Sequence, residues 1–190
     1  MILSFANRET DRIWTGERSR KLPDDIQRRA LAKLAMIDAA DHIDDLKNPP
    51  GNRLHALDGD RASQHSISIT CNGAYVSSGR TETRTMSKSS TTTEADWLHN
   101  PHAGELILSE FMEPLGLEPA ELAKAISTDS ARLRSVIDGS ARIDGELDLR
   151  LARYFRMSEG FFLRLQDQYE LREAKRALNG DLDRIVPRAA

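Results

Sequence analysis

The sequence predicts a mostly α-helical protein, in which a C-terminal five-helix domain containing a helix-turn-helix follows a small α+β segment and a flexible Ser/Thr-rich linker. Two observations carry this prediction. Apolar residues recur at helical spacing, with start and stop signals, through the second half of the chain, and the composition changes abruptly near the middle. A chain of 190 residues is long enough for one large domain or two small ones. We therefore expect an α+β segment over 1–70, a linker over 71–97, the helical domain over 98–180 and a tail over 181–190.

The expected linker is defined by its composition. Of the 24 residues in 71–94, 11 are Ser or Thr. Such a stretch buries too little apolar surface to offset the entropy that ordering it would cost. This predicts a flexible connection between two structured parts.

The N-terminal segment contains both helix and strand signals. A helix is expected to begin near Leu22-Pro23, with carboxylates in its first turn, an apolar face that includes Ile26 and Leu34, and Lys33 on another face. The expected strands lie at 2–5, 52–57 and 65–69, with a turn at 58–60. A sheet that stops at residue 69 is small and leaves an open edge.

The C-terminal part shows five helical stretches. They are expected at 105–113, 118–126, 130–138, 146–155 and 158–178. The second and third are short and separated by a break of three or four residues, which is the arrangement of a helix-turn-helix. The residues expected to hold these two helices together are Leu122, Ala123, Ile126, Leu133 and Val136.

The second helix of this pair would present polar side chains to DNA. Arg forms bidentate hydrogen bonds to guanine, and Ser reaches phosphates or base edges. The candidate DNA-binding residues are Asp129, Ser130, Ala131, Arg132, Arg134, Ser135 and Arg142. The alternative is a helical hairpin inside an ordinary bundle, without a DNA-binding role.

The charge balance excludes a strongly basic protein. The net charge is -3 for the whole chain, and residues 95–190 carry 13 basic and 17 acidic side chains, a balance of -4. Contact with phosphates must therefore come from a local cluster of cations, which Arg132, Arg134 and Arg142 could supply.

The second half of the chain resembles the HigA family of antitoxins. The resemblance covers about 98–178 and is carried by 102–111 (HAGELILSEF), 114–117 (PLGL), 121–125 (ELAKA), 138–139 (DG), 149–155 (LRLARYF) and 162–166 (FLRLQ). It implies a Cro/CI-type helix-turn-helix, a homodimer and repression of the protein's own operon at a palindromic operator in double-stranded DNA. The chain departs from the family at Ala103, usually Pro, at Ser127, usually Gly, and at Ser140 and Ala141, where basic residues are common.

The first 69 residues resemble the partner toxin of that family, HigB, a RelE-like mRNA interferase. The resemblance is carried by 16–23 (GERSRKLP), 49–54 (PPGNRL), 59–62 (GDRA) and 64–67 (QHSI), and it ends at Ile69. A single-base deletion after Ile69 in a toxin gene would produce the run from 69 to 79 and bypass the toxin's stop codon. We therefore interpret the chain as a frameshift fusion of a truncated toxin to its antitoxin; an ordinary Ser/Thr linker is the alternative.

The sequence predicts no enzyme activity. The family's acid–base candidates lie on C-terminal strands that this chain lacks, Asp58 and Ser68 replace common cations, and Arg53 and Arg61 alone do not make a nuclease. No cofactor is expected, and His99 and His102 lack a third metal ligand. A lone Cys71 excludes an internal disulfide. The chain shows neither a membrane span nor a signal peptide, which predicts a cytoplasmic protein.

Two other functions stay open from the sequence. The toxin-like segment could retain mRNA interferase activity that the fused antitoxin restrains. The helical domain could instead capture an intact HigB-like toxin from another locus, without binding DNA.

Overall fold

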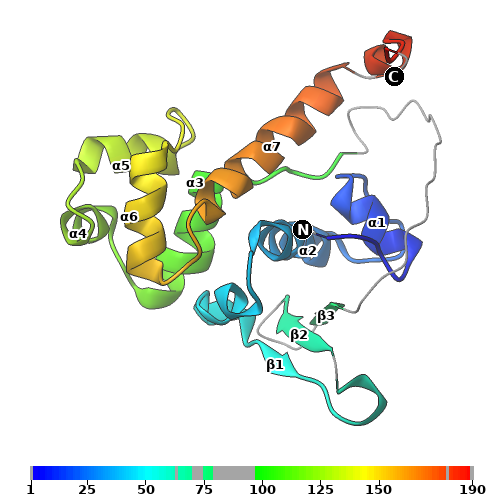
Figure 1. The fold of residues 1–190 in the computed structure, drawn as a ribbon, viewed down its shortest axis with the longest axis horizontal. Helices are drawn as coiled ribbons and strands as arrows, with labels where there is room; N and C mark the ends of the chain where they lie inside the picture. Colours follow the sequence, from blue (N-terminus) through cyan, green and yellow to red (C-terminus); the bar gives the residue numbers. More distant parts are fainter. Residues whose placement is uncertain (1, 63, 70–74, 79–96, 179, 189–190) are drawn as a thin grey trace.

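The computed structural model describes residues 2–62, 64–69, 75–78, 97–178 and 180–188 (Figure 1). Helices predominate among them, with one small sheet in the first half of the chain. The α-helices are α1 (Arg8–Trp14), α2 (Asp24–Ala39), α3 (Ala103–Leu106), α4 (Pro119–Ala125), α5 (Ser130–Ile137), α6 (Gly145–Phe155) and α7 (Phe161–Leu178). The strands are β1 (His55–Ala56), β2 (His65–Ser68) and β3 (Tyr75–Ser78).

The sheet has three antiparallel strands in the order β1-β2-β3. Ala56 pairs with His65, and Ile67 pairs with Val76. The edge of β2 that we expected to be open is therefore covered by β3, which lies inside the stretch expected to be a linker. Apart from Trp97, the remainder of that stretch, and with it most of the proposed frameshift region, falls outside the described residues.

The predicted helices of the second half form with shifted boundaries. The stretch expected as one helix over 105–113 is divided: α3 continues into a π-helical turn, Ile107–Met112, and a 3-10 turn, Glu113–Leu115. Gly116 then adopts φ +63, which ends the helix in the left-handed conformation that glycine adopts readily. The last helix begins at Phe161, three residues later than expected.

Two expectations for the N-terminal segment were wrong. Residues 2–5 form no strand, and the strand expected over 52–57 is reduced to His55–Ala56. Lys33, which the periodicity places away from the apolar face, is also buried, because α2 is covered from several sides and Lys33 is 3% exposed. The periodicity could not reveal this burial, since Glu110 and α7, which form part of the cover of α2, lie in the other half of the chain.

One hydrophobic core joins the two halves. Met36 and Ala39 of α2, with Ile67 of β2, belong to the same buried cluster as Phe111 and Phe162. In Figure 1, α2 lies beside the lower part of α7. Helices α4 and α5 lie at the left, at the opposite end of the molecule from α1. The toxin-like segment is therefore packed against the helical domain rather than separated from it.

Polar contacts cross the same boundary. Asp45 is buried, with 4% of the residue exposed. Its carboxylate accepts hydrogen bonds from the backbone N–H and the hydroxyl of Ser158 at 2.8 and 3.0 Å. Arg164 Nε donates to the carbonyl of Ala39 at 2.5 Å. Farther along α7, the Arg172 guanidinium stacks 4.4 Å from the Trp14 ring centre, and burial lowers its pKa to about 10.

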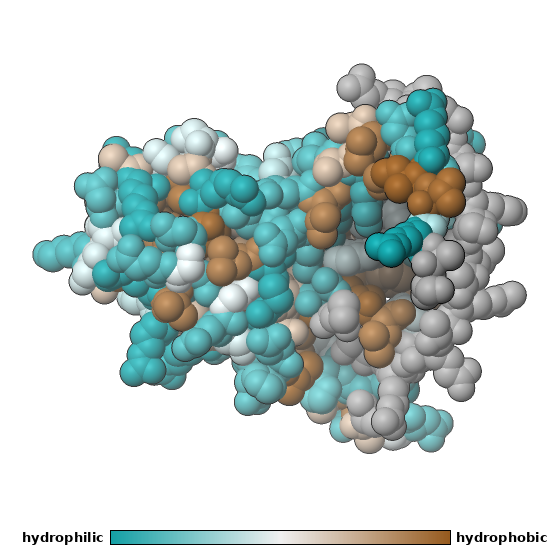
Figure 2. All heavy atoms as spheres, turned by 45° about the horizontal axis from the view of Figure 1, so that its top comes forward, coloured by the Kyte–Doolittle hydropathy of each residue, from teal (hydrophilic) through white to brown (hydrophobic). Residues whose placement is uncertain are grey.

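The face drawn in Figure 2 is mainly hydrophilic, and its hydrophobic residues form small separate groups. Within the described ranges, no helix combines the length and the apolar character needed to cross a membrane.

Candidate nucleic-acid interface

The two helices α4 and α5 form the predicted helix-turn-helix. The five residues expected to join them are all buried: Leu122, Ala123, Ile126, Leu133 and Val136. The sequence prediction for this motif is confirmed.

Helix α3 supports the back of α5 through a close approach. Gly104 lies so near the backbone of α5 that a Cβ atom added to it would overlap the carbonyl oxygen of Val136. Because that carbonyl belongs to the helix backbone, it cannot move aside as a flexible side chain could. Glycine at this position therefore sets the distance between α3 and α5.

The turn between the helices is built around Ser127. Its φ of +53 is in the left-handed region that favours glycine, as expected from a position where the family usually has Gly. Arg150 on α6 donates to the carbonyls of Ile126 and Ser127 at 2.8 and 3.1 Å. These bonds satisfy carbonyls that the end of α4 leaves without helical partners.

Asp129 begins α5 as its N-cap. The carboxylate accepts hydrogen bonds from the N–H groups of Ala131 and Arg132 at 2.9 and 3.0 Å. Ser130 follows it, half-buried, and Ala131 is exposed. The capping role of Asp129 is thus clear, and its contact with DNA remains a prediction.

Arg132 is held in place by two carboxylates at the start of α6. It contacts Asp144 and lies 3.3 Å from Glu146. These carboxylates raise the pKa of Arg132, chiefly through the hydrogen bond to Glu146. The pKa of Asp144 is lowered, first by the backbone N–H of Leu147 and also by Arg132. Any contact of Arg132 with a base must compete with this arrangement.

The other predicted residues are less constrained. Arg134 projects from α5 into solvent and makes no ion pair with any residue that the structure describes. Ser135 is half-buried, and its carbonyl accepts from the Ser140 hydroxyl at 3.1 Å. Arg142 lies in the loop after α5, with its side chain 71% exposed and 2.5 Å from Glu170.

Sequence reasoning missed the role of Arg150 and the acidic neighbours of Arg132. The spacing of Glu146 and Arg150 by four residues predicts a pair along one helix. It does not predict that Arg150 also reaches the turn of the helix-turn-helix. Similarly, Asp144 and Arg132 are 12 residues apart, and only the fold brings them together.

The two cations that remain at candidate positions in the toxin-like segment, Arg53 and Arg61, lie in or beside 3-10 turns. Arg61 donates to Gln64 at 2.9 Å, and Arg53 has φ +47 at the end of a 3-10 turn. Ser68, where the family often has Arg, is buried. Among the described residues, no group of three His, Cys, Asp or Glu is arranged to hold a metal ion.

This arrangement of capped α5, buried α4–α5 contacts and an exposed arginine defines a helix-turn-helix protein. The chain belongs to the family of virulence-associated protein I of Dichelobacter nodosus, with 32% identity over 74 residues that cover 39% of this chain and 68% of that protein. It is also similar to an uncharacterized HTH-type transcriptional regulator of Haemophilus influenzae, with 33% identity over 36% of this chain and 64% of the relative. The chain thus spans about two thirds of the length of these relatives.

The N-terminal half matches a second family. Residues 3–77 match the model of the RelE-like toxin HigB of type II toxin-antitoxin systems. The resemblance inferred from the sequence is confirmed, and the match continues for eight residues beyond Ile69 (77 minus 69). It therefore includes most of β3.

Several solved structures align with about half of this chain. One is PA4674 of Pseudomonas aeruginosa in complex with its operator DNA. The two chains are 29% identical, and the alignment covers 48% of this chain and 98% of that chain with a TM-score of 0.46. Another is an addiction module antidote protein of the HigA family from Coxiella burnetii, with 26% identity, 47% and 98% coverage and a TM-score of 0.44.

Proposed function

We propose that the chain is a sequence-specific DNA-binding antitoxin and transcriptional autorepressor of a type II toxin-antitoxin module. Helix α5 enters the major groove of its own operator. The observation that carries this proposal is the exposure of Arg134 on a helix whose opposite face, with Leu133 and Val136, is fully buried. An arginine in this position is free to make the bidentate contacts that distinguish guanine from other bases.

The relatives and the N-terminal match support the same proposal. Related proteins carry the name HTH-type transcriptional regulator, and a HigB-like toxin segment occupies residues 3–77 of this chain. A DNA-binding domain joined to a toxin-like segment fits an antitoxin that regulates a toxin-antitoxin operon. We further propose that the protein acts as a dimer on a palindromic site, with two copies of α5 about 34 Å apart.

The test is a binding measurement on the full chain. Fluorescence anisotropy would compare DNA from upstream of its own start codon with a scrambled duplex of the same length and composition, at near-physiological salt. We expect a preference of about 10³-fold or more for the upstream sequence. Equally weak binding to both duplexes, with a shallow dependence on salt, would contradict the proposal.

The second candidate function is residual mRNA interferase activity, which the match to a RelE-like toxin favours. We propose that this activity is lost, because Ser68 replaces a common cation and Arg61 is engaged with Gln64. Expression of the full chain should therefore leave growth and translated mRNA unchanged. Growth arrest that disappears when Arg53 and Arg61 are both changed to Ala would instead favour the nuclease.

Capture of a separate HigB-like toxin is the third possibility to test. The toxin-like segment of the same chain already packs against 107–112 and α7. Co-purification of the full chain with a co-expressed HigB-like toxin, without specific binding to operator DNA, would favour capture over DNA recognition.

A further inference from the structure

Two of the three arginines in the proposed DNA interface are already bound to carboxylates of the same chain. Arg132 on α5 contacts Asp144 and lies 3.3 Å from Glu146, and both carboxylates lie at the start of α6. Arg142, in the loop between α5 and α6, lies 2.5 Å from Glu170 on α7. The third arginine of the interface makes no ion pair within the described parts of the chain.

The three carboxylates lie at the surface, where a bound DNA could also reach the arginines. The side chains of Asp144 and Glu146 are 60% and 58% exposed, and that of Glu170 is 38% exposed. A phosphate binds a guanidinium through the same N–H donors that a carboxylate uses. Because an exposed ion pair is weak enough to open, phosphates and carboxylates compete for each arginine.

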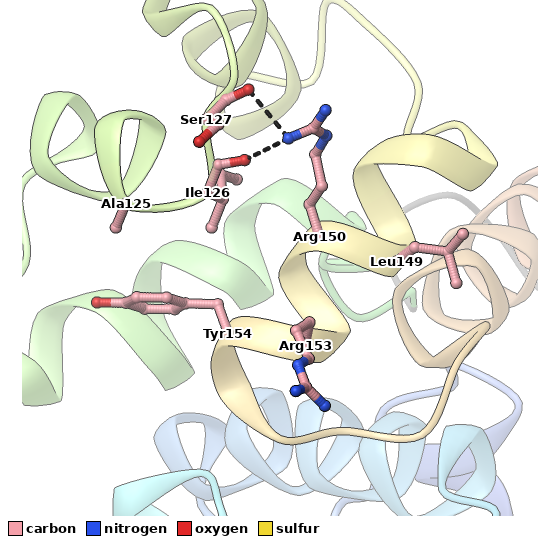
Figure 3. Close-up of a pocket in the computed structure, with 7 residues that line it drawn as sticks. All are labelled: Ala125, Ile126, Ser127, Leu149, Arg150, Arg153 and Tyr154. Carbon is pink, nitrogen blue, oxygen red and sulfur yellow. Dashed lines mark hydrogen bonds between the residues drawn. The ribbon is translucent and has the colours of Figure 1, made fainter.

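Glu146 is held in place for this competition by another arginine. Its Oε1 accepts a hydrogen bond from Arg150 Nε at 3.0 Å, while its Oε2 accepts one from Arg132. Arg150 in turn donates to the carbonyls of Ile126 and Ser127 in the turn of the helix-turn-helix, as Figure 3 shows. Glu146 can therefore move away from α5 only by losing its bonds to Arg150.

We infer that Asp144, Glu146 and Glu170 limit the affinity of this interface for DNA, because they compete with DNA phosphates for Arg132 and Arg142. This inference rests on the proposed function and names the residues that weaken it. In the free protein the carboxylates occupy both arginines, so contact with phosphates must first open these pairs. The interface then binds any DNA more weakly, and with a smaller dependence on salt, than it would with three free arginines.

The salt dependence of binding reports this competition directly. Each phosphate that an arginine neutralises releases counterions from the DNA, and the slope of log K against log salt becomes steeper by about 0.9. An arginine that stays paired with a carboxylate releases none. Removing the charge of the carboxylate should therefore add about 0.9 to the slope for each arginine freed, and raise the affinity about three- to fivefold at physiological salt.

The test measures binding of the full chain to a scrambled duplex by fluorescence anisotropy at salt concentrations between about 0.05 and 0.2 M. Glu170→Gln frees Arg142, and the double variant Asp144→Asn with Glu146→Gln frees Arg132. The amides keep the shape of the carboxylates, and Asn still caps a helix. Both variants should bind more tightly and with a steeper slope. Unchanged affinity and slope in both variants would overturn the inference.

Two controls separate this competition from a change in net charge. Asp181→Asn also removes one negative charge, but it releases Arg184 beyond the end of α7 and should leave affinity and slope nearly unchanged. In an Arg142→Ala background, Glu170→Gln should bring no gain, because no arginine remains to be freed. An equal gain with and without Arg142 would show that Glu170 acts by general repulsion of DNA, and would overturn the inference.

The scrambled duplex keeps this test independent of operator recognition. The proposed function is contradicted if the unchanged chain shows no preference for the upstream duplex over the scrambled one. The inference is contradicted if the variants gain neither affinity nor slope on the scrambled duplex, whether or not that preference exists.

Discussion

Lys33 of the toxin-like segment and Glu110 of the helical domain form a buried ion pair, with Nζ and Oε2 separated by 2.5 Å. Their side chains are 4% and 15% exposed. Lys33 also donates to Asn52 Oδ1 at 2.8 Å, and Asn52 in turn donates to the carbonyl of Leu46. The charges of two segments 77 residues apart in sequence are thus satisfied only when both segments fold together.

Breaking this pair should destabilise the whole molecule. Lys33→Met leaves the Glu110 carboxylate without its main partner, and Glu110→Gln removes the charge that neutralises Lys33. We expect each change to lower the free energy of unfolding by about 3 kcal/mol, measured by urea denaturation. Lys47→Met, which removes an exposed pair with Asp44, should cost less than about 1 kcal/mol.

A double variant tests whether the loss of stability comes from leaving one buried charge unpaired. Lys33→Met combined with Glu110→Leu leaves no unpaired charge in the interface, so stability should recover toward that of the unchanged chain. If Lys33→Met costs no more than Lys47→Met, the ion pair does not hold the two segments together.

Gly104 should tolerate no larger residue. Gly104→Ala drives a methyl group against the carbonyl of Val136 and separates α3 from α5, so we expect a loss of about 2 kcal/mol or more and a lower melting temperature. Gly145→Ala is the matched control, because a Cβ there meets no atom within 4 Å. Equal melting temperatures for the two variants would show that α3 does not approach α5 so closely.

Replacing Ser127 with glycine should stabilise the folded protein. Because its φ is +53, Ser127→Gly relieves a steric cost of about 1 kcal/mol that is partly offset by the greater freedom of glycine in the unfolded chain. A gain of about 0.5 kcal/mol in unfolding free energy is expected. Ser127→Ala keeps the Cβ atom and should give no gain; a gain of the same size from Ala would rule out backbone strain as the cause.

The two arginines of α5 should differ in their effects on DNA binding. Arg134→Ala should weaken operator binding by about 1–3 kcal/mol and relax base preference at one position. Arg132→Ala also removes the partner of Asp144 and Glu146, so it should lower both affinity and thermal stability. Unchanged affinity and sequence preference in both variants would contradict the assignment of α5 as the recognition helix.

Two carboxylates at the start of α6 should make the stability of the protein depend on pH in the acid range. The folded protein lowers the pKa of Asp144 below its ordinary value, chiefly through the N–H of Leu147, and lowers the pKa of Glu146 likewise, chiefly through Arg150. Lowered carboxyl pKa values contribute stability that is present above the unfolded pKa and is lost as the pH falls through the folded pKa.

We therefore expect stability to be insensitive to these groups between pH 6 and 8 and to fall below about pH 4. Denaturation of the Asp144→Asn variant should show a smaller loss between about pH 5 and 3 than the unchanged chain. An identical pH dependence in both proteins would show that Asp144 does not contribute.

The helix-turn-helix was predictable from sequence because its signals are local. The Asp129 cap, the spacing of Leu122 and Ile126, and the left-handed turn at Ser127 all depend on residues within a few positions. Such signals remain visible without knowledge of the fold.

The burial of Lys33 and the pairing of Arg132 were not predictable in the same way. A lysine in an amphipathic helix usually faces solvent, and only Glu110 and Asn52, brought in by tertiary packing, make its burial possible. Likewise, no periodicity relates Arg132 to Asp144, because a loop separates α5 from α6 and the two residues are 12 positions apart. The sequence therefore placed the candidate residues of α5 correctly on one helix. It did not predict that Arg132 is paired with Asp144 and Glu146.

The most direct test of DNA recognition by α5 is footprinting of the full chain on DNA from upstream of its own start codon, with methylation interference at guanine N7. We predict two protected half-sites whose centres are one helical turn, about 10 base pairs, apart, and loss of guanine interference in the Arg134→Ala variant. Uniform or absent protection, or an interference pattern that Arg134→Ala leaves unchanged, would contradict the proposal.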